Sequence, residues 1–457
     1  MEKNGILIIG LGKSGIAAAL LAKRRGYDVY VTEYKRTPKN ENRFRKLEEH
    51  GIEYEVGNSD KFFNKCNTAV ISPGIDPKLD YIKSVKNNMN IISEIEFAYK
   101  FKKENQKLIA ITGTNGKSTV TTMIYKILKK AGKKVALTGN IGYPLSDYID
   151  GDYDFFSCEV SSYQLEKIEK FSPDVSVLLN VTPDHLNRYD YNFDDYFKTK
   201  LKIFENLKNT STVVINGDEE NLKNIDFEEN RDILSFSRNK VVKNGAYILD
   251  RNFVLRKNNK IKKIMSVDSV KIEGIHNLWN IMASICATEK YVSDINVYQE
   301  VFEEFESLEH RLETVDIYNG IKFINDSKAT NIESLEKALE SFKNNRIILI
   351  LGGDASKKSD FMRLKTLFKN KCKFILLIGE TKNSIADSFN KEGINNHMKV
   401  EDMDEAVSMG YKKGNRKDVV LLSPGAASFD MYDNFEQRGK IFKESVNKLV
   451  TGEKNAV

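Results

Sequence analysis

The sequence predicts an α/β protein built from three domains, and three observations support this fold class. The chain has 457 residues, a length that suits two to four domains. Short apolar segments of strand type alternate with helical patterns, as in parallel sheets joined by right-handed crossovers. Two of these strands run directly into glycine-rich turns that open helices. We expect the domains to span residues 1–92, 93–304 and 305–457.

Composition excludes several classes of protein. Hydrophobic residues make up 40% of the chain and charged residues 30%, so the chain can build cores that a disordered protein lacks. No apolar run approaches the ~20 residues of a membrane-spanning helix, and the stretch Ile6–Leu11 is too short for a signal-peptide core. Lys+Arg 71 minus Asp+Glu 65 gives a net charge of +6, spread along the chain. This pattern fits either anionic small molecules such as nucleotides or ordinary surface charge. We expect no membrane and no nucleic-acid partner.

The cysteines indicate a reducing compartment. Four are present and scattered, without a CxxC pair, so neither a disulfide framework nor a zinc site is expected. We expect Cys66, Cys158, Cys286 and Cys372 to be buried or half-buried in a cytoplasmic protein.

The first block opens with the strand Gly5–Ile9, a glycine-rich turn and a helix from about Ile16 to Arg25. Further strands are expected at Tyr27–Thr32 and Thr68–Ser72. The turn reads Gly-Leu-Gly-Lys-Ser-Gly over residues 10–15, and acidic Glu33 follows 33 − 15 = 18 residues after its last glycine. A diphosphate fits the start of such a helix, as part of either a nicotinamide dinucleotide or a UDP-linked substrate. Close packing of helix on strand, without a ligand, is the alternative.

The second block places a phosphate-binding loop after the continuous apolar strand Lys107–Thr112. The helix that follows runs to about Ala131. In a loop of this kind glycines let the backbone N–H groups face a phosphate, the lysine adds a full charge and a hydroxyl can ligate Mg²⁺. The spacing departs from GxxxxGK[ST], because Ile111 occupies the position of the first glycine. The loop residues are Gly113, Thr114, Asn115, Gly116, Lys117, Ser118 and Thr119.

Acidic and histidine residues follow two later strands of this block, expected at Phe155–Val160 and Val175–Asn180. Glu159 ends the first strand, where a carboxylate points into the ligand crevice of an open α/β sheet. His185 follows the second strand in Asp-His-Leu-Asn-Arg-Tyr, either as a metal ligand or as a structural partner of Asp184. By itself, Lys200 would be interpreted as an ordinary lysine on the solvent-exposed face of a helix.

The rest of the chain continues the α/β pattern. We expect a strand at Lys134–Thr138, a small antiparallel addition within residues 210–270, and a helix near Asn277–Ser293. Strands of the third block are expected at Lys322–Asn325, Arg346–Gly352, Phe374–Gly379 and Val419–Ser423.

These motifs, taken in order, resemble the Mur ligase family over essentially the whole chain. The strings are GLGKSG, SPGI, GTNGKST, GNIG, EVSSYQL, NVTPDHLNRY, HNLWN, EHR, NDSKATN, GGD and SPGAASFDMYDNFEQRG. DHLNRY and SFDxxxNFEQRG are closest to the D-glutamate-adding branch. The DNPR signature of the diaminopimelate-adding branch is absent, and the related folylpolyglutamate synthases lack the first domain.

The resemblance implies a Rossmann-like UDP-binding domain, a central P-loop-type ATPase and a C-terminal Rossmann-like domain. It also implies an ATP-dependent ligase that activates a carboxylate as an acyl phosphate for attack by an amine. The substrates would be UDP-N-acetylmuramoyl-L-alanine, D-glutamate and ATP, in peptidoglycan precursor synthesis, and the protein would be a monomer. Two Mg²⁺ ions are implied, one held by Ser118 and Glu159 and the other by His185, with Lys200 carbamylated beside them.

Further roles are implied residue by residue. The nucleotide contacts would be Asn277, Asn280, Arg311, Asp326 and Lys328, besides the phosphate loop. The UDP-muramoyl substrate would contact Ser14, Glu33, Tyr34, Ser72, Pro73, Gly74, Ile75, Asn140 and His185. D-glutamate would contact Thr330, Lys357, Ser428 and Phe435, with Lys358 as the alternative to Lys357.

Three other functions stay open from the residues. The chain could be a Mur-type ligase for a different amino acid, a NAD-dependent oxidoreductase, or a nucleotide-binding module without turnover. HNLWN could be only a polar helix start beside a buried Trp279, and NDSKATN only a helix cap.

Overall fold

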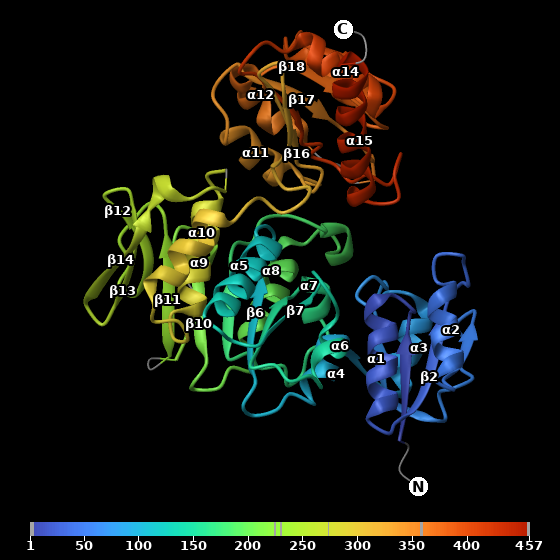
Figure 1. Ribbon diagram of the computed structural model, residues 1–457. Coiled ribbons are helices and arrows are strands. Elements are labelled where there is room, and N and C mark those ends of the chain that lie inside the picture. The colour runs from blue at the N-terminus through green and yellow to red at the C-terminus, as the bar shows by residue number, and fades with distance from the viewer. Residues whose placement is uncertain (1–3, 224, 229–230, 273, 357–359, 455–457) are drawn as a thin grey trace. The chain divides into compact units, whose positions relative to one another are not determined.

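The computed structural model describes residues 4–223, 225–228, 231–272, 274–356 and 360–454 (Figure 1). By its contacts the chain forms two compact units, residues 1–269 with 279–303, and residues 270–278 with 304–457. Helices and parallel-rich sheets alternate in both units, so the predicted α/β class is confirmed. The domain boundaries near residues 92 and 304 stay predictions.

A five-stranded parallel sheet in the order β3-β2-β1-β4-β5 begins the chain. Its first strand is buried along its whole length, as expected for a parallel sheet covered on both faces. The first helix starts at Lys13 rather than Ile16, because Gly10, with φ of 85°, turns the chain at once and Gly12 caps the helix. The elements are β1 (Gly5–Ile9), α1 (Lys13–Arg24), β2 (Asp28–Glu33), α2 (Glu41–Glu49), β3 (Glu53–Val56), β4 (Cys66–Ile71), α3 (Asp80–Asn88), β5 (Asn90–Ser93) and α4 (Glu94–Tyr99).

The second sheet has nine strands in the order β14-β13-β12-β11-β10-β9-β6-β8-β7. Its strands are β6 (Lys107–Thr112), β7 (Val135–Gly139), β8 (Phe155–Glu159), β9 (Val175–Leu178), β10 (Thr212–Asn216), β11 (Asp232–Ser237), β12 (Gly245–Leu249), β13 (Asn252–Lys257) and β14 (Lys260–Ser266). Its helices are α5 (Lys117–Lys130), α6 (Leu145–Tyr148), α7 (Ser162–Leu165), α8 (Phe193–Leu201), α9 (Asn277–Thr288) and α10 (Ile295–Glu304). Short 3₁₀ turns are η1 (Leu186–Tyr189), η2 (Lys202–Phe204), η3 (Glu220–Leu222) and η4 (Val267–Ser269).

The expectation of a small antiparallel addition within 210–270 is right only for its last part. The strands β10, β11 and β12 extend the parallel sheet, and only the pairings β12–β13 and β13–β14 are antiparallel. For β10 and β11 the reason lies in the connections, because the segments that precede them are long enough for the crossovers that parallel strands require. The strands β13 and β14 instead follow tight turns.

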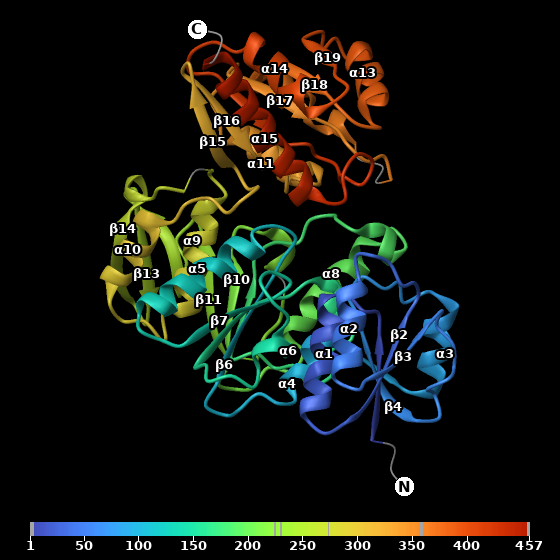
Figure 2. The same cartoon turned by 45° about the vertical axis from the view of Figure 1, so that its right-hand side comes forward.

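The third sheet, β15-β16-β20-β17-β18-β19, is parallel apart from the antiparallel edge strand β15 (Figure 2). The helices α11, α12 and α13 cover one face, while α14 and α15 pack together on the other. The elements are β15 (Glu313–Tyr318), β16 (Ile321–Asn325), α11 (Ile332–Glu340), β17 (Ile347–Leu351), η5 (Phe361–Leu364), α12 (Lys365–Lys371), β18 (Cys372–Leu377), α13 (Lys382–Lys391), β19 (His397–Lys399), α14 (Met403–Lys413), β20 (Val419–Leu422) and α15 (Phe435–Lys454).

The cysteines and the helices agree with what the composition predicts. All four cysteines are buried and unbonded to each other, as predicted. No helix among the described residues has both the length and the apolar character needed to cross a membrane.

A buried carboxylate joins the end of the first sheet to the second. Glu96 in α4 is 0% exposed, and its oxygens accept the backbone N–H groups of Glu169 (2.9 Å), Lys170 (3.1 Å) and Phe171 (2.8 Å). Because a desolvated charge is stable only when its hydrogen bonds are made, these three donors fix α4 against the loop after α7.

Substituting Glu96→Gln should lower the free energy of unfolding of this unit by about 2–3 kcal/mol, since the amide NH₂ would face backbone N–H donors. The shift in the urea midpoint, followed by fluorescence, measures it. Exposed Glu104 supplies the matched control, Glu104→Gln, which should leave the midpoint unchanged. Equal midpoints for both variants would contradict the role of Glu96.

Candidate active site

The phosphate loop is bound to the carboxyl end of the neighbouring strand β9. The backbone N–H of Thr114 donates to the carbonyl of Asn180 at 2.9 Å. The side chain of Asn180 then makes a reciprocal pair with Asn115, accepting from its N–H at 2.9 Å and donating to its carbonyl at 3.0 Å. The loop between β6 and α5 is therefore fixed from outside before any ligand arrives.

Two glycines of the loop have conformations that other residues rarely adopt. The φ angle is 153° at Gly113 and 86° at Gly116. A Cβ on Gly116 would lie 2.5 Å from the side-chain oxygen of Asn280, so Asn280 in α9 lies directly against the loop. This contact unites two predicted nucleotide-binding motifs.

Two lysines converge on one carbonyl of the loop. The ammonium of Lys117 donates to the carbonyls of Gly113 (2.8 Å) and Thr114 (2.7 Å), and that of Lys200 donates to Gly113 at 2.9 Å. Lys200 is only 2% exposed. Burial lowers its pKa well below the ordinary value, and the charge of Lys117 adds to this, against the opposing carboxylates of Asp184 and Glu159. Two lysine side chains directed at one loop suit a polyanionic ligand.

A buried carboxylate with one free oxygen stands at the end of β8. Glu159 is 2% exposed, and its Oε1 accepts from the side chain of Asn140 at 3.0 Å. Its Oε2 is buried without a hydrogen-bond partner among the described residues. A lone buried carboxylate oxygen fits a hard divalent cation, and the hydroxyl of Ser118 in α5 is an oxygen donor of the same type.

The histidine of DHLNRY adopts a left-handed conformation with φ of 52°. Its Nε2 lies 3.5 Å from Asp184 Oδ2, its side chain is 44% exposed, and its ring meets Tyr163 edge-on at 5.4 Å. His185 therefore has the carboxylate neighbour, Asp184, that a purely structural role requires. Its side chain is also exposed enough to bind a ligand.

The glycine-rich turn of the first sheet is closed by two side chains. Ser72 Oγ donates to the carbonyl of Gly10 at 2.8 Å, and Glu33 Oε2 accepts from the N–H of Leu11 at 2.6 Å. Ser14 is half-buried and Tyr34 is 75% exposed. The predicted substrate residues of this domain thus gather around one turn, with Pro73, Gly74 and Ile75 in the loop after β4.

Predicted residues of the second unit form their own cluster. Asp326 accepts from Ser423 Oγ at 2.8 Å and from the N–H of Leu312 at 3.2 Å, and burial raises its pKa to about 7. The ammonium of Lys328 lies 3.7 Å from the ring centre of Phe435.

Other predicted site residues of this unit differ in their burial. Ser428 is buried, Arg311 and Thr330 are half-buried, and Asn277 belongs to this unit by its contacts. Lys357 and Lys358 lie outside the described residues. That this cluster and the phosphate loop act on one nucleotide stays a prediction.

Several supporting residues were missed by the sequence reasoning. Tyr196, buried in α8 one turn before Lys200, has its hydroxyl 3.0 Å from Thr114 Oγ1 in the loop. Arg188 forms two hydrogen bonds of 2.8 and 2.7 Å with Glu166 and donates to the carbonyl of Ile75 at 2.9 Å. Arg188 lies within the string NVTPDHLNRY, which was the available signal, whereas Tyr196 lies outside every quoted string. The partners of both residues lie far away in sequence.

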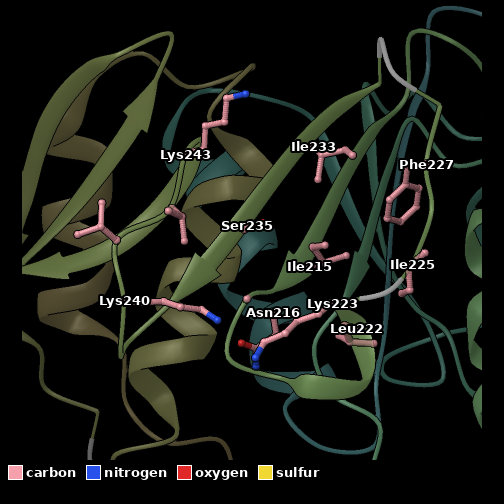
Figure 3. A pocket seen from close by; sticks show the side chains of 13 residues that line it. Ile215, Asn216, Leu222, Lys223, Ile225, Phe227, Ile233, Ser235, Lys240 and Lys243 are labelled. Carbon is pink, nitrogen blue, oxygen red and sulfur yellow. The ribbon is translucent and has the colours of Figure 1, made fainter.

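A separate groove of about 360 Å³ lies at β10 and β11, with an apolar floor that includes Ile215 and Ile233 (Figure 3). Lys223, Lys240 and Lys243 also line it. None of the predicted site residues lines it, so it is distinct from the candidate active site.

Three family models match the chain in succession. They are the MurD N-terminal domain over residues 5–81, the Mur ligase middle domain over residues 111–288, and the Mur ligase glutamate ligase domain over residues 310–425. The middle match contains the phosphate loop, Glu159, His185 and Lys200.

Two relatives that match along nearly the whole chain carry the same name. The chain is 38% identical over 450 residues to the UDP-N-acetylmuramoylalanine–D-glutamate ligase of Caldicellulosiruptor saccharolyticus, covering 97% of this chain and 98% of that protein. It is 36% identical over 453 residues to the ligase of the same name from Clostridioides difficile, covering 98% and 99%.

Solved structures agree in fold. The UDP-N-acetylmuramate-alanine ligase of Thermotoga maritima matches with a TM-score of 0.61 at 21% identity, covering 97% of this chain and 99% of that one. MurF from Acinetobacter baumannii matches with a TM-score of 0.60 at 15% identity, covering 96% and 93%. With the relatives that match along its whole length, these findings show that the chain belongs to the Mur ligase family.

Proposed function

We propose that this protein is an ATP-dependent ligase that joins D-glutamate to UDP-N-acetylmuramoyl-L-alanine in peptidoglycan precursor synthesis in the cytoplasm. The observation that carries the proposal is the convergence of Lys117 and Lys200 on the phosphate loop beside the free carboxylate oxygen of Glu159. The shared name of the full-length relatives supports the choice of substrates.

The proposed reaction has two steps. A carboxylate oxygen of the L-alanyl substrate attacks the γ-phosphorus of ATP, and ADP leaves. The amine of D-glutamate then attacks the acyl carbon, the C–O bond to phosphate breaks, and the nitrogen loses a proton. Phosphoryl transfer depends on positioning and charge stabilisation. Lys117 would give up its contacts with its own loop to meet the β- and γ-phosphates, while the loop N–H groups hold them.

Two Mg²⁺ ions are part of this proposal. Ser118 and Glu159 would hold one, and His185 with Lys200 the other. The ions, when bound, would neutralise phosphate charge that otherwise repels the attacking carboxylate.

Lys200 would serve as a carbamate. Its buried amine has a lowered pKa and is therefore more often neutral, which is the form that attacks CO₂. The new N–C bond forms with loss of a proton, and the neutral amine becomes an anion. This change would give Lys117 an anionic neighbour and give the second ion a carboxylate-like ligand.

Substrate contacts follow the predicted motifs. The turn at Gly10 would hold the uridine diphosphate, and Asn140 would hold the muramoyl group. The nucleotide would meet Asn277, Asn280, Arg311, Asp326 and Lys328, besides residues 113–119. D-glutamate would meet Thr330, Ser428, Phe435 and Lys357. A monomer contains all of these residues.

Purified protein with Mg²⁺, ATP and UDP-N-acetylmuramoyl-L-alanine should release ADP only when a suitable amino acid is added. Across a panel of L- and D-amino acids, we expect D-glutamate to give the highest rate and a product extended by one residue. Highest turnover with another amino acid would replace the proposed substrate. ATP binding without any turnover would favour the non-catalytic module, and nicotinamide binding the oxidoreductase.

Substituting Lys200→Ala should abolish turnover, because the ligand formed by the carbamate is lost, and added formate or acetate should restore part of it. Steady-state ADP release measures both effects. Lys198→Ala, an exposed lysine on the same helix, is the control and should retain normal activity. Full activity of the Lys200 variant without added carboxylate would rule out the carbamate.

A further inference from the structure

The largest fully buried side chain of the described residues is a cation that the proposed reaction does not use. Arg438, in the first turn of α15, is 1% exposed. Burial lowers its pKa to about 10, so it remains charged at neutral pH. A fully buried charge is costly unless its donors are all engaged, which calls for a specific reason for its presence.

The partners of this guanidinium are two loops of the third sheet. Its Nε donates to Ser327 Oγ at 3.0 Å and one Nη donates to the Ser327 carbonyl at 2.8 Å. The other Nη donates to the carbonyls of Ala426 and Ala427, both at 3.1 Å. The planar fork thus joins the loop after β16 to the loop after β20.

Both loops carry predicted ligand contacts next to the residues that Arg438 binds. Ser327 stands between Asp326 and Lys328, the predicted nucleotide contacts. Ala427 precedes Ser428, a predicted D-glutamate contact. A carbonyl that moved by one ångström would carry its neighbouring side chain with it.

A third loop depends on the same arrangement. The N–H of Asp354 donates to the carbonyl of Ala427 at 3.0 Å. Gly353 has φ of 154°, and a Cβ there would lie 2.3 Å from that carbonyl and 3.2 Å from the Arg438 guanidinium. The GGD segment therefore packs directly over the position that Arg438 fixes, and only glycine fits.

We propose that Arg438 is a positioning residue that couples the nucleotide loop (residues 325–331) to the amino-acid loop (residues 423–428), so that ordering of either loop orders the other. This inference rests on the proposed function for the identity of the two ligands. The coupling follows from the shared guanidinium: binding that fixes one set of carbonyls also fixes the fork that holds the other set.

The test compares Arg438→Met, Arg438→Lys and Arg438→Ala in the full-length protein. Methionine fills the space without the fork, and lysine keeps a charge without planar geometry. Both should raise the KM for D-glutamate and for ATP by about tenfold or more, with a smaller change in kcat, because the loops must be ordered by the ligands themselves. Arg363→Ala, which removes a surface arginine of the same unit, should leave both KM values unchanged.

Guanidinium rescue separates positioning from simple stability. Guanidinium chloride, far below denaturing concentrations, should lower the raised KM values of Arg438→Ala, whereas equal NaCl should not. Hydrogen exchange should be faster in residues 325–331 and 423–428 of each variant and slowed again by guanidinium. This readout does not require turnover, so it still tests the coupling if the wild type fails with D-glutamate. Wild-type KM values in Arg438→Met, or faster exchange spread evenly over the unit, would overturn the proposal.

Discussion

The attachment of the phosphate loop to the strand and helix beside it is the constraint on which the rest of the site depends. Asn180 at the end of β9 holds the loop backbone by three hydrogen bonds, and α8 reaches it with Tyr196 and Lys200. A loop that presents N–H groups to a phosphate binds it less tightly if the loop must first be ordered, because ordering costs conformational free energy. Here protein contacts made at a distance in sequence supply that order.

Buried charges recur at the places where segments meet, and each is handled differently. Glu96 is satisfied by three backbone donors and serves the fold. Arg438 is satisfied by carbonyls and joins loops. Glu159 keeps an oxygen that has no hydrogen-bond partner in the described part of the chain, and Lys200 lies near the charge of Lys117. These two incompletely compensated groups lie beside the phosphate loop, and buried groups of this kind indicate ligand chemistry rather than stability.

Those parts of the fold and the site that depend on residues close together in sequence could be predicted. The segment Lys107–Thr112 is found with the predicted bounds, since a continuous apolar run followed by glycines leaves few alternatives. The short polar strands β3, β15 and β19 were missed, because edge strands carry little periodicity. The partners of Asn180 and Arg438 could not be predicted, since spacing does not reveal contacts between segments tens of residues apart. The need for glycine at position 353 could not be predicted either, because it comes from the carbonyl of Ala427 in another loop.

In the proposed reaction, the terminal phosphoryl group of ATP passes to a carboxylate before the amide forms. Substrate labelled with heavy oxygen in the L-alanyl carboxylate tests it most directly, by mass spectrometry of the inorganic phosphate released during turnover with D-glutamate. We expect one labelled oxygen in each phosphate, because the C–O bond breaks when the amine attacks. Phosphate that carries only unlabelled oxygen, formed alongside the amide, would contradict it.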